Sequence, residues 1–151
     1  MNLSDVFSGL AVIDRFAQPL LQEAGYEPDG FNGAGLCPEP ADPDEAFLLN
    51  TVRKLLESLD ELHDTLQYLH TPTHGVYSLE PMPGNRYGYH DEDGCPHIFH
   101  CGDTFEALIP GLGWYDMPAW APTRIEHNGS EYCLDGFKGV ELLGLPIRER
   151  W

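Results

Sequence analysis

The densest group of side chains with metal-binding chemistry lies between residues 95 and 101, where two cysteines and two histidines occur. Thiolate sulfur and neutral imidazole nitrogen are the ligands that zinc prefers. In an extended strand, however, Cys95 and Cys101 lie about 20 Å apart, and His100 points to the face opposite His97. Only Cys95 with His97, or a bent segment, could chelate one ion. We therefore expect no metal and no cofactor, with half-buried thiols and imidazoles as the favoured interpretation and structural zinc as the alternative.

No catalytic pattern accompanies these or the other cysteines and histidines. The sequence contains no nucleophile elbow, oxyanion loop or local protease signature beside any cysteine. Neighbouring carboxylates say little about acid–base chemistry in a chain with 25 Asp and Glu. Arg124 and Glu126 share one strand face, which favours a structural ion pair. We expect a protein that is not an enzyme.

Negative charge is spread along the whole sequence. The 25 Asp and Glu face only 8 Lys and Arg, which gives a formal net charge of -17. Direct nucleic-acid binding is not expected, because that affinity depends on Lys and Arg displacing counterions from phosphates. The complementary partner is a basic protein, for example a nucleic-acid-binding enzyme. The alternative is that the acidity only keeps the protein soluble.

The N-terminal segment does not have the pattern of a signal peptide or a membrane anchor. It has no basic n-region, and Asp5 and Asp14 interrupt its apolar residues. No apolar run in the chain approaches the roughly 20 residues that span a bilayer. We predict a cytoplasmic protein with no membrane contact, in which the cysteines are reduced.

Two helices are predicted before residue 71. The first runs from about Ser4 to Ala24, and Pro19 is expected to kink it or to end its regular part near Ala17. The second runs from Asp42 to His70, with Asp42 as its cap and a proline at its first position. A Gly/Pro-rich loop, residues 25–42, joins them, and the simplest packing is an antiparallel hairpin.

The second helix has an apolar face and an acidic face. Four carboxylates at spacings of three and four are expected to project together into solvent: Glu57, Asp60, Glu61 and Asp64. Leu49 and Leu56 widen the apolar face, which favours burial within one chain and a monomer; a coiled-coil dimer is the alternative. The apolar seam recurs at alternating steps of four and three, at Leu48, Val52, Leu55, Leu59, Leu62, Leu66 and Leu69.

After Thr71-Pro72 the apolar period changes to two, which predicts short strands separated by turns such as Asp93-Gly94 and Asn128-Gly129. The fold class is therefore α+β, with a helical hairpin, residues 1–71, packed on a small antiparallel barrel, residues 72–151. The strands are expected at about Val76–Leu79, Arg86–Asp91, His97–Cys101, Phe105–Ile109, Thr123–His127, Tyr132–Leu134 and Val140–Leu145.

One segment between the strands is rich in large apolar side chains without alternation. Trp114, Tyr115, Asp116 and Met117 stand among glycines and prolines, which predicts a surface loop that binds a partner. The alternative is a lid that folds back over the barrel or the helices.

The second half of the chain resembles a small bacterial family of domains of unknown function, DUF5348, over about residues 50–150. The resemblance implies a short SH3-like barrel after a helix and a gene carried by plasmids, phages or integrative elements; it supplies no catalytic residue. The loop at residues 110–119 and the N-terminal helix depart from the family pattern and are expected to carry what is specific to this protein. The matching blocks are Gly75–Tyr77, Asn85–Tyr87, Cys101–Ile109, Trp120–Glu126, Tyr132–Leu134 and Leu142–Arg148.

These observations predict a non-enzymatic inhibitor from a mobile element or phage. Along the second helix, Glu57 and Asp64 lie about 10.5 Å apart with two carboxylates between them, a spacing comparable to that of phosphates along a strand. Such a ridge would mimic nucleic acid and occupy the basic surface of a host defence nuclease, as an anti-CRISPR protein does. The alternative is a structural or regulatory adaptor whose barrel binds a protein partner, with the acidity incidental.

Overall fold

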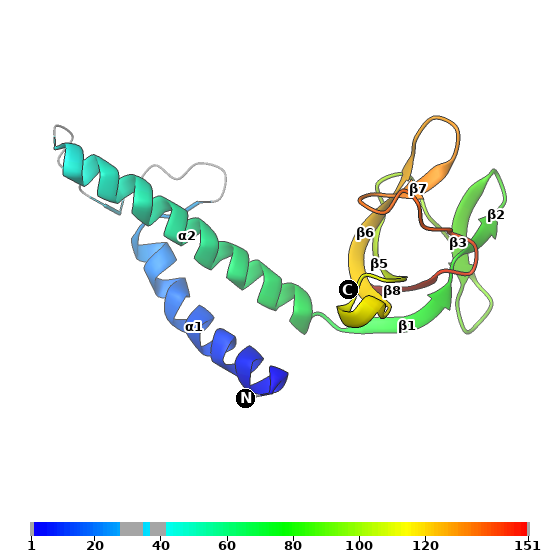
Figure 1. Ribbon diagram of the computed structural model, residues 1–151, viewed down its shortest axis with the longest axis horizontal. Coiled ribbons are helices and arrows are strands. Elements are labelled where there is room, and N and C mark those ends of the chain that lie inside the picture. The colour runs from blue at the N-terminus through cyan, green and yellow to red at the C-terminus, as the bar shows by residue number, and fades with distance from the viewer. Residues whose placement is uncertain (1, 28–34, 37–41, 151) are drawn as a thin grey trace. The chain divides into compact units, whose positions relative to one another are not determined.

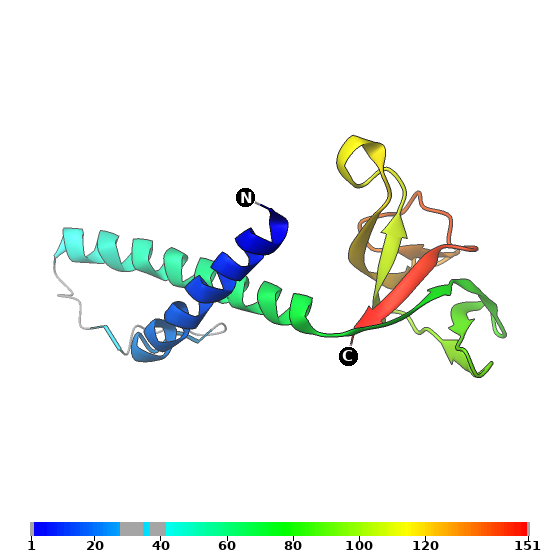
Figure 2. The ribbon, with the colours of Figure 1, turned by 90° about the horizontal axis from the view of Figure 1, so that it is seen from below.

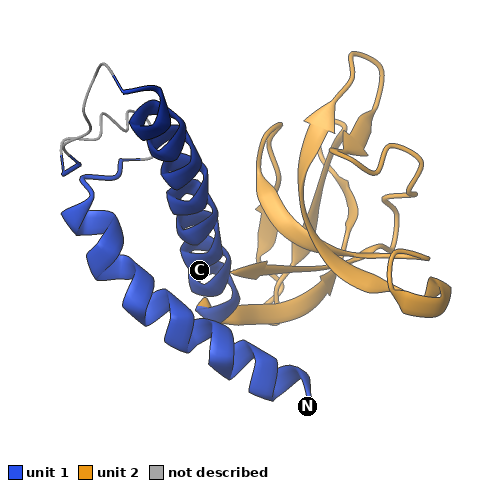
Figure 3. Ribbon diagram, turned by 60° about the vertical axis from the view of Figure 1, so that its left-hand side comes forward, with its two compact units in different colours: residues 1–70 blue, residues 71–151 orange. Residues whose placement is uncertain are grey.

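The computed structural model describes residues 2–27, 35–36 and 42–150, and within these residues two helices precede eight short strands (Figure 1). The chain divides into two compact units, a helical unit, Met1–His70, and a β unit, Thr71–Trp151 (Figure 3). The predicted α+β class is confirmed. Cys37 and most of the Gly/Pro-rich loop, including Gly30 and Gly33, lie outside the described residues.

Helix α1 spans Leu3–Glu23 and begins with a capping box. The Asn2 side chain accepts a hydrogen bond from the Asp5 backbone N–H, and the Asp5 carboxylate accepts one from the Asn2 N–H, so two N–H groups at the helix start are satisfied. The predicted helix from about Ser4 to Ala24 is confirmed, but the alternative that its regular part ends near Ala17 is wrong, because α1 continues through Pro19. The residues after Pro19 pack against α2, and this burial offsets the hydrogen bond that a proline removes.

Helix α2 spans Pro43–His70, and its predicted cap is confirmed because the Asp42 carboxylate accepts a hydrogen bond from the Asp44 N–H at 2.8 Å. The predicted seam is only partly buried. Leu48, Leu55 and Leu69 are 53%, 60% and 45% exposed, whereas the buried residues of α2 are Leu56 and Leu66. A single neighbouring helix covers one narrow stripe, and the stripe that α1 covers lies to one side of the predicted seam.

The two helices cross as an antiparallel hairpin (Figure 2). Three contacts define the direction. The rings of Phe7 and His70 lie 5.4 Å apart, Asp14 Oδ1 lies 2.9 Å from His63 Nδ1, and Leu21 packs with Leu56. Each contact is seven residues from the next on both helices, in opposite directions. The hairpin prediction is therefore confirmed, and the contacts follow a heptad.

The β unit contains two antiparallel sheets, one in the order β1-β8-β5-β6-β7 and one in the order β2-β3-β4. The strand expected at Val140–Leu145 is wrong: this segment turns at Gly144, where φ is +76°, and the last strand follows it. Closure into an SH3-like barrel and packing of the hairpin on it stay predictions. The strands are β1 Thr73–Ser78, β2 Glu80–Met82, β3 Arg86–His90, β4 Pro96–Ile98, β5 Thr104–Ile109, β6 Ala119–His127, β7 Tyr132–Leu134 and β8 Pro146–Arg150.

A charged network lies beside the apolar core of the β unit. Glu106 of β5 is buried and accepts hydrogen bonds from Arg148 and Arg150 of the neighbouring strand β8. The Arg148 guanidinium also lies 4.3 Å from the centre of the Trp120 ring. Two cations and an aromatic face compensate for the burial of one carboxylate, and the network connects strands β5, β6 and β8.

Candidate binding surfaces

The aromatic loop, residues 110–118, joins β5 to β6 and contains the short 3-10 helix η1, Trp114–Asp116. The Gly113 N–H donates to the Met117 carbonyl at 2.7 Å, and the Met117 N–H donates to the Trp114 carbonyl at 3.3 Å, so the loop closes on itself. Tyr115 and Asp116 both have left-handed backbones, with φ of +56° and +57°. This conformation costs roughly 1–2 kcal/mol for each residue that has a Cβ, which indicates a turn held by its closure rather than by local preference.

The side chains of this loop face solvent. Trp114 is 87% exposed and Tyr115 is 94% exposed, and Met117 is also largely exposed. The alternative of a lid folded back over the β unit is therefore wrong, and the loop lies on the surface of its own unit as predicted; a lid over the helices stays a prediction. Exposed tryptophan and tyrosine carry much of the contact energy where proteins bind one another. The loop therefore presents large exposed apolar side chains on a closed turn.

The acidic ridge of α2 is only partly as predicted. Glu61 and Asp64 are exposed, but Glu57 and Asp60 are half-buried, because the face covered by α1 reaches them. Glu57 also accepts a hydrogen bond from Arg53 at 3.0 Å, and the positive charge of this arginine partly compensates the negative charge of Glu57. The pKa of Tyr26 is raised, first by burial and then by the negative charges of Asp60 and Glu57. The expectation that all four carboxylates project freely into solvent is wrong.

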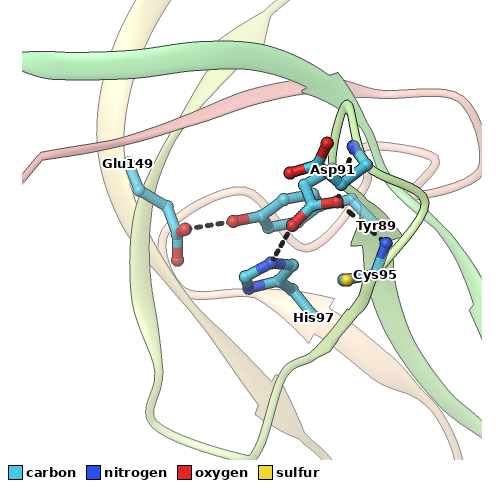
Figure 4. Close-up of polar contacts among 6 residues, drawn as sticks. Tyr89, Asp91, Cys95, His97 and Glu149 are labelled. Carbon is cyan, nitrogen blue, oxygen red and sulfur yellow. Dashed lines mark hydrogen bonds and ion pairs between the residues drawn. The ribbon is translucent and has the colours of Figure 1, made fainter.

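A polar cluster surrounds Tyr89 in the β unit (Figure 4). The buried Tyr89 hydroxyl donates to Glu149 Oε2 at 2.5 Å, and its ring is stacked between Tyr77 and His97, at 4.2 and 4.7 Å between ring centres. Burial, followed by the hydrogen bond to Glu149, raises the pKa of Tyr89 well above its ordinary value. This tyrosine therefore stays protonated and acts as a hydrogen-bond donor.

His97 belongs to the same cluster. Its Nε2 lies 3.0 Å from Asp91 Oδ2, and the other carboxylate oxygen of Asp91 accepts hydrogen bonds from the backbone N–H groups of Cys95 and Asp93. The hydrogen bond to His97, and then the one from Cys95, lower the pKa of Asp91. The arrangement fixes the turn between β3 and β4, which is a structural use of an Asp–His pair.

The cysteines and histidines of residues 95–101 do not converge. Strand β4 ends at Ile98, so the assumption of one extended strand through Cys101 is wrong. His97 contacts Asp91, His100 lies near Asp103, and Cys101 donates to Glu126. Cys95 and Cys101 are exposed rather than half-buried. Among the described residues, no three His, Cys, Asp or Glu side chains are grouped closely enough to hold a metal ion.

A pocket that the sequence did not indicate lies elsewhere on the β unit. It has a volume of about 380 Å³, and its lining includes Tyr87, Tyr132, Glu131, Glu141 and Lys138. The two tyrosine rings meet edge to face at 6.3 Å. Aromatic faces beside carboxylates suit a cationic side chain. These residues come from segments about fifty positions apart, so spacing along the chain gives no signal for them.

The aromatic loop and this pocket are separate surfaces. The loop that contains η1 and the turn between β6 and β7 lie at opposite ends of the β unit (Figures 1 and 3). The acidic ridge belongs to the helical unit. The structure therefore does not bring the predicted binding residues together within one unit.

Comparison with known families bears on the β unit. Residues 81–148 match the family described as Domain of unknown function (DUF5348). The match confirms the resemblance seen in the sequence blocks for these residues, and it includes the aromatic loop and the residues of the tyrosine pocket named above.

The match to DUF5348 does not include the helical unit. No curated protein and no solved structure matches the chain. Neither α1 nor α2 contains an apolar stretch long enough to cross a membrane.

Proposed function

We propose that this protein is a non-enzymatic binding protein that anchors itself on a basic protein partner through the aromatic loop. The observation that carries the proposal is the almost complete exposure of Trp114 and Tyr115 on a turn that closes on itself. A turn whose backbone is already closed loses little backbone conformational entropy on binding. An exposed tryptophan–tyrosine pair therefore offers two strong anchors.

The charge of the chain supports a basic partner. With a formal net charge of -17, the protein attracts positive surfaces over roughly 10 Å at 0.1 M salt. Asp116 adds a carboxylate between Tyr115 and Met117, and Glu61 and Asp64 add exposed carboxylates on α2. The specific form of the proposal is an inhibitor from a mobile element or phage that mimics nucleic acid and occupies the basic surface of a host defence nuclease.

The test begins with capture of the partner by tagged protein from a bacterial lysate and its identification by mass spectrometry. The partner is then purified, and its affinity for this protein and for DNA is measured at several salt concentrations. Trp114→Ala with Tyr115→Ala should speed dissociation by roughly 1,000-fold, because two anchor residues that contribute about 2 kcal/mol each contribute about 4 kcal/mol together. The matched control is Leu143→Ala, which changes another exposed apolar residue of the β unit.

Charge variants separate steering from anchoring. Neutralising Asp116, Glu61 and Asp64 with Asn or Gln should slow association and flatten its salt dependence, while dissociation changes little. A partner held equally well without Trp114 and Tyr115 would refute the anchoring loop. A partner that binds DNA and this protein at the same time would refute mimicry.

A second candidate is an adaptor whose β unit binds a peptide of a partner protein. The pocket of Tyr87 and Tyr132 favours it, because Glu131 and Glu141 line the same cavity and complement a Lys or Arg side chain. Under this alternative, Glu131→Gln with Glu141→Gln weakens binding and the loop variant has no effect. The two functions thus predict opposite outcomes for the same pair of variants.

A further inference from the structure

The helical unit has apolar side chains that α1 and α2 do not cover for each other. On α2 the uncovered residues Leu48, Leu55 and Leu69 follow a seven-residue repeat, and the half-buried Leu62 fills the remaining position. This row is the part of the predicted seam that the hairpin leaves open. A heptad row of leucines on one helix is typical of packing against another helix.

A matching row lies on α1. Val6, Ile13 and Leu20 also recur every seven residues, and each is about half exposed. Phe16, which is 77% exposed, lies beside this row, one turn from Ile13 and Leu20. Both helices therefore carry a partly exposed apolar row of the same period.

The two rows lie on the same side of the hairpin. Each row residue precedes a residue of the hairpin contact by one position: Ile13 precedes Asp14, and Leu55 precedes Leu56. Antiparallel helices turn in opposite senses when viewed from one end, so the same backward step on each helix points to the same side of the pair. Val6 and Leu69, one from each row, line the same apolar pocket of about 560 Å³.

Charged side chains lie along the other side of the hairpin. The positions one step after the contact residues point away from the apolar rows and include Arg15, Glu57 and Asp64. On the apolar side, the α2 row is bordered by Thr51 and Ser58, and by Asp44 beside Leu48; on α1, Glu23 borders Leu20. Acidic side chains therefore border the apolar rows only at the loop end of the hairpin.

We propose that this apolar side pairs with the same side of a second copy of the chain, so that two hairpins form a four-helix bundle. The exposed parts of the seven row residues and Phe16 amount to roughly 800 Å² per copy, at about 200 Å² for a fully exposed large apolar side chain, which is the area that a specific interface buries on each partner. The equal heptad rows allow the two copies to interdigitate.

The charge distribution selects a second copy over a basic partner at this surface. A basic helix would need carboxylates along the apolar rows, and Asp44 and Glu23 border these rows only at the loop end. Two copies, by contrast, meet mainly through uncharged surfaces, so most of the negative charge of the helical units stays apart. This pairing is independent of partner binding through the aromatic loop, and a dimer presents that loop twice.

The experiment is sedimentation equilibrium of the full chain at micromolar concentration. The wild type should be a dimer. Leu55→Lys should raise the dimer dissociation constant by at least about 100-fold, because it buries two charges in the interface. The matched control Gln22→Lys introduces the same charge at an exposed position on the other side and should remain dimeric.

Far-UV circular dichroism shows whether each variant keeps its helices. If Leu55→Lys unfolds, Ile13→Lys makes the same test on α1. A monomeric wild type, or a dimer that both folded lysine variants leave intact, would overturn the proposal. A monomeric Leu55→Lys variant with native helix content, beside a dimeric Gln22→Lys variant, would establish it.

Discussion

Replacing Glu106 by Gln removes a negative charge from β5 and keeps the shape of the side chain. Glu106 is 4% exposed, and it accepts hydrogen bonds from Arg148 Nε and from Arg150 Nε, the latter at 2.7 Å. The side chains of the two arginines are only 21% and 12% exposed, so water has little access to their charges. The substitution removes the Glu106 carboxylate from beside two largely buried cations.

Loss of one partner from a buried ion pair costs about 3–5 kcal/mol. Here Arg148 keeps its contact with the Trp120 ring, and Arg150 keeps its hydrogen bond to the Thr71 carbonyl at 2.8 Å. We therefore expect a loss near the lower limit, about 3 kcal/mol, for Glu106→Gln. In a domain of this size the midpoint of thermal unfolding should fall by roughly 12–24 °C.

Tryptophan fluorescence measures this loss in the β unit alone, because Trp114, Trp120 and Trp151 all lie in residues 71–151. The matched control is Glu126→Gln, which breaks an ion pair with Arg124 at 2.8 Å whose side chains are 35% and 52% exposed. That exposed pair contributes at most about 1 kcal/mol. If urea unfolding gives equal losses for the two variants, the argument from burial of Glu106 is wrong.

Three further predictions concern other parts of the molecule. The folded protein raises the pKa of Tyr89 above its ordinary value of 10.0, so the folded state holds the phenol proton more tightly than the unfolded chain does. The resulting stabilisation is complete below pH 10.0, and it is lost as the pH rises from there through the pKa of Tyr89 in the folded state. Unfolding midpoints across alkaline pH should show this loss in the wild type and a smaller one in Tyr89→Phe. Leu56→Ala should destabilise the helical unit by about 2–5 kcal/mol, measured as earlier loss of the helical circular dichroism signal, because Leu56 is buried between the helices. Purified protein should contain less than one zinc per chain by elemental analysis, and Cys95→Ser should keep its native tryptophan fluorescence; one zinc per chain, lost together with the fold in that variant, would show a structural metal site.

Features that depend on neighbouring residues were predictable from the sequence. The Asp42 cap uses an interaction two residues away. The turns at Gly94 and Gly129 need positive φ, and the structure has φ of +78° and +100° there. The aromatic loop was also predictable as a surface, because large side chains without alternation among glycines and prolines fit neither a strand nor a helix.

Other features depend on which distant segments meet. The sequence of α2 does not specify which part of its apolar face another helix covers. Packing against α1 buries Leu56 and leaves Leu55 exposed. The same packing leaves Asp60 half-buried, although the sequence pattern predicted that it would be exposed with the other carboxylates of α2. The periodicity predicted the two helices, and their contact selected the faces that remain available for binding.

Long-range pairing was beyond the reach of sequence patterns. Tyr89 meets Glu149 across sixty residues, and Glu106 meets Arg148 across forty-two. In so acidic a chain many carboxylates could pair with each arginine or lysine, and the spacing of residues along the sequence does not indicate which of them does. By itself, the sequence determined the α+β class, the hairpin and the exposed aromatic loop, because short-range periodicity and turn chemistry dictate these. Only the tertiary structure decided the buried charge network, the tyrosine pocket and the uncovered side of the hairpin, because each depends on the packing of elements that are distant in the chain.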